Sequence, residues 1–266
     1  MTNPLVLFSG GLDSTYLVSH LLQYGPVDIL YVNGGQCKNK IAAEIKARDK
    51  LIAKLNQFYP HKIQAEYEIL EPLYRHSPQS KAYTQPNAWI QGAYRILDKN
   101  RHSSLQIAYV SDDGAGFGAV TNDIKDLWAA TLKVGYSGEH VPLEFPLLHT
   151  SKLEILEKLD KRLLQDIWVC ELPINEKHCG DCKPCTLMRN VLSQYKQKHG
   201  ETVWNTALRT IRELTEPRTR IEQREWHKDS SYVLHDHNYY ENVAGHPRRI
   251  KPRSTDAICQ LIEKCT

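Results

Sequence analysis

The stretch that most constrains this chain of 266 residues is residues 5–15, which read LVLFSGGLDST. Its first four residues are apolar and predict a short buried parallel strand, Gly10 and Gly11 predict a sharp turn, and the leucines that follow recur at helical spacing. A strand–loop–helix unit of this kind points backbone N–H groups into one concave space at a helix N-terminus, where partial positive charge gathers. The stretch therefore predicts a site for phosphate or pyrophosphate.

The polar side chains of this loop add detail to the prediction. Ser9, Ser14 and Thr15 offer hydroxyl donors, whereas Asp13 suits an anion site only if it holds a Mg²⁺ that the phosphates also bind. A glycine turn before an ordinary helix, with Asp13 or Ser14 near its N-cap, is the alternative interpretation. The pattern lacks the GxxxxGK of a Walker A loop and differs from GxGxxG, which argues against kinase and dinucleotide-binding classes.

The complete pattern SGGLDST after an N-terminal strand resembles the PP-loop of the N-type ATP pyrophosphatases. Members of that superfamily cleave ATP between the α- and β-phosphates and adenylate an acceptor. The resemblance implies catalytic roles for Asp13 and Ser14. It also implies ATP contacts from eight consecutive residues, namely Phe8, Ser9, Gly10, Gly11, Leu12, Asp13, Ser14 and Thr15.

Strand and helix patterns alternate along the next 150 residues. Strands are expected at 27–32, 63–70, 105–110 and 141–147. Residues 17–22 complete the first helix, and further helices are expected around 41–55 and at 89–97, 123–134 and 153–164. Ser151 and Glu154 form a predicted capping box at the start of the last helix. Residues 71–87 are expected to form a loop over the nucleotide site. The alternation predicts an α/β protein with a parallel, doubly wound, Rossmann-like sheet.

Two acidic residues, Asp112 and Asp113, follow the strand expected at 105–110. At the carboxyl end of a strand they suit Mg²⁺ coordination or substrate contact, and we count them among the nucleotide-site candidates. Asp-Asp-Gly is also ordinary turn chemistry, so a role as turn formers stands equally.

A second constellation consists of four cysteines in a C-x8-C-x2-C-x2-C arrangement, Cys170, Cys179, Cys182 and Cys185. Thiolates two residues apart on a tight knuckle can share one tetrahedral ion, and this spacing predicts a structural Zn²⁺ site without an open coordination position. Free thiols and an iron–sulfur cluster are the alternatives. His178 is a further candidate ligand, although four thiolates already suffice.

The two constellations together resemble the QueC family of 7-cyano-7-deazaguanine synthases over residues 4–190. Further matches are Gly35-Gln36 with Glu44 downstream, Pro146-Leu147 leading to SKLEI at 151–155, Trp168-x-Cys170, and CGDCKPC at 179–185. The resemblance implies an adenine nucleotide alpha hydrolase-like fold, homodimerisation, and Gln36 in the nucleotide site. It also places Lys152 near the phosphates as a catalytic residue, against the alternative of a solvated helix-cap lysine.

The activity implied by this resemblance is ATP-dependent ligation. The carboxylate of 7-carboxy-7-deazaguanine is adenylated with MgATP, pyrophosphate leaves, ammonia displaces AMP to form the amide, and a second adenylation allows dehydration to the nitrile. Two departures from the family pattern affect the expected substrate contacts and leave the identity of the acceptor open. Pro86-Asn87-Ala88-Trp89 lacks the arginine of the family's Pro-x-Arg-Asn, and the glycine-rich segment 111–121 replaces an aspartate- and tyrosine-containing loop.

The sequence divides into a PP-loop domain (1–165), a cysteine segment (166–195) and an extension (196–266) that a minimal QueC lacks. The extension interleaves basic and aromatic residues, Arg209, Arg212, Arg218, Arg220, Arg224, Arg248, Arg249, Lys251 and Arg253 with Trp204, Trp226, Tyr232, Tyr239 and Tyr240. These suit nucleic-acid binding or a protein interface, and the alternative is a mostly helical subdomain with solvated arginines.

Composition and the remaining features bound the class. A net charge of +3 is too small to indicate a nucleic-acid binder, and 41% hydrophobic residues are enough to fill a sizeable core. Neither a membrane span nor a signal peptide is recognisable, so a cytoplasmic protein is expected.

Three functions remain. They are a QueC-like synthase, a QueC-like ligase of a defence or modification system that joins the deazaguanine to a protein or nucleic-acid amine, and a non-catalytic zinc-stabilised nucleic-acid-binding module.

Overall fold

A computed structural model gives the arrangement of the chain. It describes residues 2–34, 38–70, 85–113, 117–135, 141–173, 177–180 and 182–200 and the strands at 232–235, 238–243 and 246–250. The chain forms two compact units. The first comprises Met1–Gly35, Glu44–Arg75 and Ala82–Trp168, and the second Gln36–Ala43, His76–Lys81 and Val169–Thr266.

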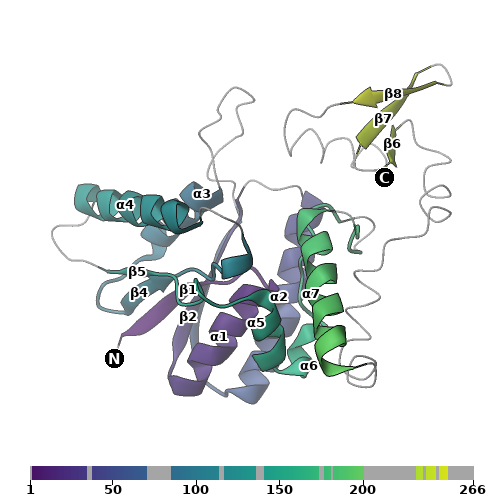
Figure 1. The fold of residues 1–266 in the computed structure, drawn as a ribbon. Coiled ribbons are helices and arrows are strands. Elements are labelled where there is room, and N and C mark those ends of the chain that lie inside the picture. Colours follow the sequence, from purple (N-terminus) through teal and green to yellow (C-terminus); the bar gives the residue numbers. More distant parts are fainter. Residues whose placement is uncertain are drawn as a thin grey trace. The chain divides into compact units, whose positions relative to one another are not determined.

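The first unit is built on a five-stranded parallel sheet in the order β3-β2-β1-β4-β5 (Figure 1). The strands are β1 (Asn3–Leu7), β2 (Val27–Val32), β3 (Ile63–Ile69), β4 (His102–Gln106) and β5 (Leu143–Glu144). All six residues of β2 are buried, as expected for a strand covered on both faces. The strand order reverses between β1 and β4, and ligands of open α/β sheets bind at the carboxyl ends of strands at such a switch point.

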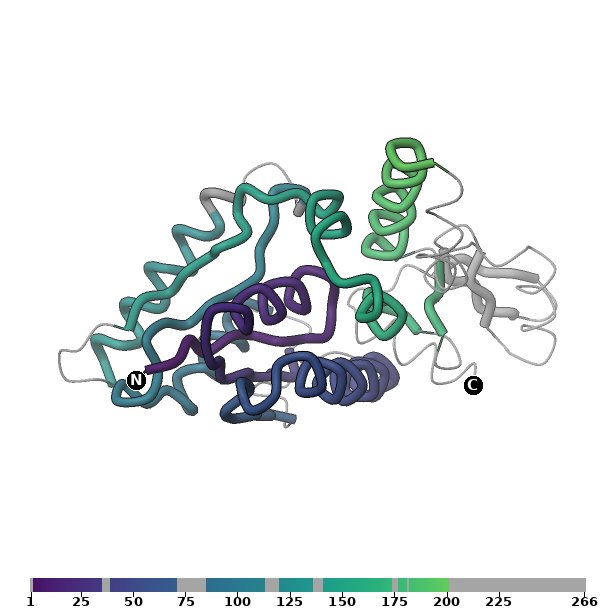
Figure 2. The backbone as a smooth tube through the Cα atoms, turned by 90° about the horizontal axis from the view of Figure 1, so that it is seen from below, coloured from purple at the N-terminus to yellow at the C-terminus, as the bar shows by residue number. Residues whose placement is uncertain are grey.

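Helices cover both faces of this sheet, with α3 and α4 on one face and α1 and α5 on the other (Figure 1). Their bounds are α1 (Leu12–Tyr24), α2 (Lys38–Phe58), α3 (Gln85–Ile96), η1 (Ser111–Asp113), α4 (Phe117–Gly135), α5 (Lys152–Lys158) and α6 (Lys161–Leu164). The core beneath α3 and α4 contains Leu5, Leu30, Ile90 and Trp128. Helix α5 packs beside α1 (Figure 2). The predicted doubly wound α/β fold is therefore confirmed.

Helices α3 and α4 begin earlier than expected, at Gln85 and Phe117, and three other differences concern β4, β5 and the last helix of the first unit. The strand expected at 105–110 is β4, which begins at His102 and ends at Gln106, where the N–H of Tyr109 turns back to the carbonyl of Ile107 at 3.0 Å. The strand expected at 141–147 is paired only at Leu143–Glu144. The helix expected at 153–164 is two helices, because the Asp160 carboxylate accepts the Arg162 N–H at 2.9 Å and caps a new helix, α6.

The second unit contains α7 (Lys183–His199) and three antiparallel strands in the order β6-β7-β8. These strands are β6 (Tyr232–His235), β7 (Asn238–Val243) and β8 (His246–Ile250). The extension was expected to be mostly helical, whereas its described residues beyond α7 form this sheet. Aromatic and β-branched residues such as those in YVLH and NYYENV favour strands.

The described part of the chain contains no helix that is both long and apolar enough to cross a membrane.

Candidate active site and metal centre

The loop between β1 and α1 has the conformation that its glycines permit. Gly10 has a φ of +77°, in the left-handed region, and a Cβ added there would lie 3.0 Å from Cγ of Arg48. Gly11 is the N-cap of α1 and provides no side-chain cap for the helix. The first-turn N–H groups of a helix have no partners within the helix, so this loop offers backbone donors to an anion.

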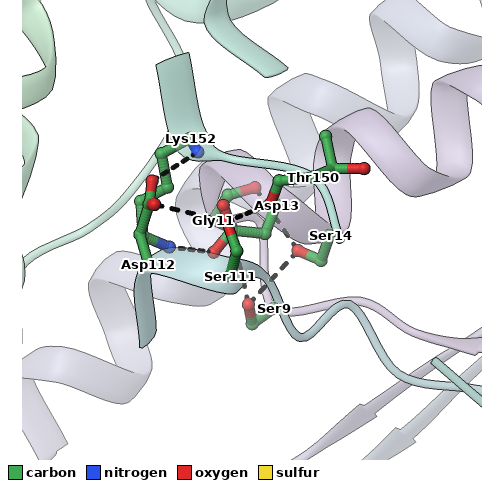
Figure 3. Close-up of polar contacts among 8 residues, drawn as sticks. All are labelled: Ser9, Gly11, Asp13, Ser14, Ser111, Asp112, Thr150 and Lys152. Carbon is green, nitrogen blue, oxygen red and sulfur yellow. Dashed lines mark hydrogen bonds and ion pairs between the residues drawn. The ribbon is translucent and has the colours of Figure 1, made fainter. Parts of the chain in front are cut away.

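Hydroxyl groups line the same turn, as the sequence predicted. The Oγ atoms of Ser9 and Ser14 lie 3.3 Å apart, and the Ser14 hydroxyl also donates to the Gly11 carbonyl at 3.3 Å (Figure 3). Thr15 is fully buried, and among the described residues its Oγ1 has no hydrogen-bond partner. Phe8 and Leu12 are buried as well, at 1% and 3% exposure, so their backbone groups are what they can offer a nucleotide.

Lys152 and Asp13 meet although they are 139 residues apart in the sequence. Nζ of Lys152 donates to Oδ2 of Asp13 at 2.5 Å, and the two side chains are 11% and 21% exposed (Figure 3). A lysine so shielded is unlike a solvated helix-cap residue. The two predicted catalytic residues from the PP-loop and from the SKLEI segment thus share one site.

A complete capping box fixes the position of Lys152 at the start of α5. The Glu154 N–H donates to Oγ of Ser151 at 3.2 Å, and the Ser151 N–H donates to Oε2 of Glu154 at 2.7 Å. The backbone hydrogen bond from Ser151 lowers the pKa of Glu154, because it stabilises the charged carboxylate. The predicted box is therefore present, and it orients the first turn that carries Lys152.

Asp112 joins the end of the β4 segment to the same helix. Its Oδ2 accepts the backbone N–H of Lys152 at 2.6 Å, while the hydroxyl of Ser111 donates to the carbonyl of Thr150 at 3.2 Å. Asp112 therefore lies beside Lys152, and its carboxylate supports the start of α5 by accepting this N–H. The side chain of Asp113 and all of Gln36 lie outside the described residues.

Two contributors to this region were absent from the sequence prediction. Thr150 went unnoticed because a backbone carbonyl has no sequence signature, although its position just before the Ser151 cap was a usable signal. Arg48 has no motif of its own, because it is one of several charged residues in its helix. Its spacing from Ile45, Ile52 and Leu55 places it on the apolar stripe, which was the available signal.

The four predicted metal ligands form one cluster in the second unit. All four Sγ atoms lie within 4.8 Å of one another, and each cysteine is buried. Zn–S bonds of about 2.3 Å place tetrahedral sulfurs about 3.8 Å apart, and the Sγ atoms of Cys170 and Cys182 are 4.0 Å apart. Backbone N–H groups point at the sulfurs, from Cys179 to Cys170 at 3.2 Å and from Cys182 to Cys179 at 3.3 Å. The donor set therefore fits one tetrahedral ion.

His178 does not belong to this cluster of ligands. Its Nε2 accepts the N–H of Val169 at 3.3 Å, and burial lowers the pKa of the ring to about 4. A neutral imidazole that accepts a backbone N–H supports the segment from which the first cysteine projects. The prediction that four thiolates suffice agrees with this arrangement.

The fold and the loop define the class of this protein. The strand order of the parallel sheet reverses beside β1, and the motif SGGLDST connects β1 to the start of α1. This is the arrangement of a PP-loop nucleotide-binding enzyme. The chain belongs to the QueC family, because the family model described as queuosine biosynthesis protein QueC matches residues 3–196. Membership in this family makes the chain a PP-loop enzyme with a metal-binding cysteine cluster.

No curated protein matches the chain. Among solved structures, a U34-tRNA thiolase NcsA from Methanococcus maripaludis, with its 4Fe–4S cluster, is similar at 16% identity. The match covers 81% of this chain and 74% of that chain, with a TM-score of 0.42.

Proposed function

We propose that the protein activates the carboxylate of 7-carboxy-7-deazaguanine with MgATP and forms the amide and then the nitrile with ammonia. The observation that carries this proposal is the ion pair between Asp13 and Lys152, which unites the PP-loop with the SKLEI segment. The family match over residues 3–196 supports the choice of acid.

The chemistry explains why a phosphate loop is needed. A carboxylate is a poor electrophile because its leaving group would be oxide. Its oxygen attacks the α-phosphorus of ATP, the bond from that phosphorus to the β-phosphate oxygen breaks, and pyrophosphate leaves. Ammonia then adds to the acyl carbon, loses a proton, and displaces AMP. In a second round the amide oxygen is adenylated, and loss of AMP and protons gives the nitrile.

The residues divide this work between them. The loop amides and the hydroxyls of Ser9 and Ser14 would hold the pyrophosphate as it gains charge, and Asp13 would hold the Mg²⁺ that accompanies ATP. Lys152 would then exchange its ion pair with Asp13 for the phosphates, while the metal compensates the Asp13 carboxylate. In the ion pair that the structure shows, the two side chains compensate each other's charge.

The cysteine cluster would hold a structural Zn²⁺. Cys170, Cys179, Cys182 and Cys185 complete a closed shell, so the ion would contribute folding free energy and would leave no position for a reacting water. Metal analysis together with the absorbance spectrum distinguishes this ion from an iron–sulfur cluster, which absorbs in the visible range.

A second candidate function changes only the acceptor, so that an amine of a protein or nucleic acid replaces ammonia. It is favoured by Trp89, which stands in the segment where the family pattern has its Pro-x-Arg-Asn. Trp89 lies on α3 with its ring 6.0 Å from that of Tyr109, which follows β4. Both rings pack against the hydrophobic core, so the support for a different acceptor is the missing arginine, and the basic extension would supply the contact with that macromolecule.

The test is incubation of the protein with MgATP and 7-carboxy-7-deazaguanine, with and without ammonium, and analysis of AMP and products by mass spectrometry. The nitrile is expected only when ammonium is present. Detection of AMP together with a macromolecular adduct would instead indicate that an amine of a protein or nucleic acid is the acceptor. Absence of AMP under every condition would contradict adenylation and favour the binding module. The analogue that lacks the carboxyl group is the control and should give no AMP.

Replacing Lys152 with methionine is expected to lower the rate of AMP formation by about 10²-fold, because one positive charge near the departing pyrophosphate is lost. Steady-state kinetics with saturating MgATP and acid measure the effect. Lys158→Met is the matched control, since Lys158 is an exposed lysine of the same helix. Equal rates for the two variants would remove Lys152 from the proposed mechanism.

A further inference from the structure

A buried cation lies directly behind the PP-loop. Arg48 projects from α2, and its side chain is completely buried, at 0% exposure. Its Cγ limits the space at Gly10, where an added Cβ would be 3.0 Å away, and its backbone nitrogen would be 3.5 Å from the same Cβ. The left-handed turn of the loop is therefore packed against the stem of this arginine.

The guanidinium of Arg48 is held from three sides. Its Nη1 pairs with Oε1 of Glu68 on β3 at 2.5 Å. Its Cζ lies 4.7 Å from the ring centre of Tyr31 on β2 and 5.7 Å from that of Phe8, the residue just before Ser9. Cation–π contacts with two rings suit a planar guanidinium and fix its orientation.

A second hydrogen bond braces this arrangement. The Tyr31 hydroxyl donates to Oε2 of Glu44 at 2.7 Å in a buried contact, and Glu44 lies one helical turn before Arg48 on α2. Burial, followed by the charge of Glu44, raises the pKa of Tyr31, so the phenol stays protonated as the donor. The ring against which Arg48 packs is thus itself fixed.

The charge of Arg48 is only partly compensated. Among the described residues, its Nε and Nη2 atoms have no hydrogen-bond partner. Two carboxylates of β3 act on the guanidinium, Glu68 through its hydrogen bond and Glu66, whose pKa burial raises and the charge of Arg48 lowers. Both are exposed and therefore share their charge with solvent, and the buried Glu44 carboxylate instead accepts the Tyr31 hydroxyl. A buried, incompletely paired cation lowers stability relative to an apolar side chain of similar volume, so packing alone does not explain its presence.

We propose that Arg48 is a positioning residue of the PP-loop. Its stem supports the Gly10 turn, and its charge supplies a fixed positive potential behind the loop that receives ATP phosphates. This inference rests on the proposed function in taking ATP as the ligand of the loop. Charge in a water-excluded site acts on a nearby anion more strongly than charge in solvent does, so its effect should be specific to phosphate-bearing ligands.

The experiment compares Arg48→Met, which keeps the stem and loses the charge, with Arg48→Lys, which keeps both. Calorimetric titration with MgATP measures the dissociation constant, and steady-state kinetics measure KM for the acid. We expect Arg48→Met to weaken MgATP binding by at least about 10-fold with KM for the acid within about 2-fold, and Arg48→Lys to restore most of the affinity. Should Arg48→Met fail to fold, Arg48→Gln takes its place.

The control is Glu68→Gln, which alters the charged partner of Arg48 while the loop contact is kept, and it should change MgATP affinity less than Arg48→Met does. A folded Arg48→Met variant that binds MgATP as tightly as the wild type would overturn the inference. The two proposals also fail separately. Wild-type protein that binds MgATP but forms no AMP with the acid contradicts the adenylation, whereas unchanged affinity in Arg48→Met contradicts only the role of Arg48.

Discussion

Replacing Asp13 with alanine is expected to lower the rate of AMP formation by about 10³-fold or more. The change removes the carboxylate that would hold Mg²⁺ beside the phosphates, and it also removes the partner of Lys152, whose Nζ lies 2.5 Å from Oδ2. The lost interaction acts mainly on the charge that develops on pyrophosphate. The expected effect is therefore a fall in kcat larger than the rise in KM for ATP.

The control for this variant is Asp123→Ala, which removes an exposed carboxylate of α4. Circular dichroism should show the same secondary structure in both variants, because Asp13 lies at a helix N-terminus and is itself partly exposed. Asp13→Asn should retain the shape of the side chain and still lose most of the activity, since an amide is a weak Mg²⁺ ligand. An Asp13→Ala protein with wild-type turnover would contradict the assignment of the site.

Strands β1, β2 and β3 were predictable because each has a strong local signal, whereas the paired residues of β4, HSSLQ, lie mostly before the apolar segment that predicted it. The run VDILYV, apolar except for Asp28, lies between a Gly-Pro end signal and a turn, and all six residues are buried in β2. Strand and helix ends are set differently, by short-range hydrogen bonds that the apolar pattern does not reveal. The backward turn of Tyr109 ends β4 early, and the Asp160 cap divides the last expected helix of the first unit.

The site was predictable where spacing carries the chemistry. The cysteine spacing alone places four thiols together, and their sulfurs do meet within 4.8 Å. The contact of Lys152 with Asp13 joins segments 139 residues apart, and only the family resemblance pointed to it. Arg48 was not predicted to be buried, because a charged residue is not expected on the apolar stripe of a helix, although its spacing places it there. A charged residue at core spacing is therefore worth examining as a buried support.

Replacing Cys182 with serine is expected to remove the bound metal and lower the melting temperature by more than about 10 °C. The sulfur of Cys182 is 4.0 Å from that of Cys170, and Cys182 is the N-cap of α7, so the lost ligand lies at the start of a helix. A structural ion contributes its binding free energy to folding, and several kcal/mol correspond to about 10 °C or more for a chain of this length.

Metal content by mass spectrometry and thermal unfolding together measure this effect, with Ser193→Ala, at an exposed position of α7, as the control. The two quantities should fall together in Cys182→Ser and stay at wild-type values in the control. Chelation of wild-type protein should lower the melting temperature to about that of Cys182→Ser, because both treatments leave the buried thiols without an ion. Wild-type protein that carries no metal and keeps full stability would contradict the structural role, since four clustered thiols would then be stable without an ion.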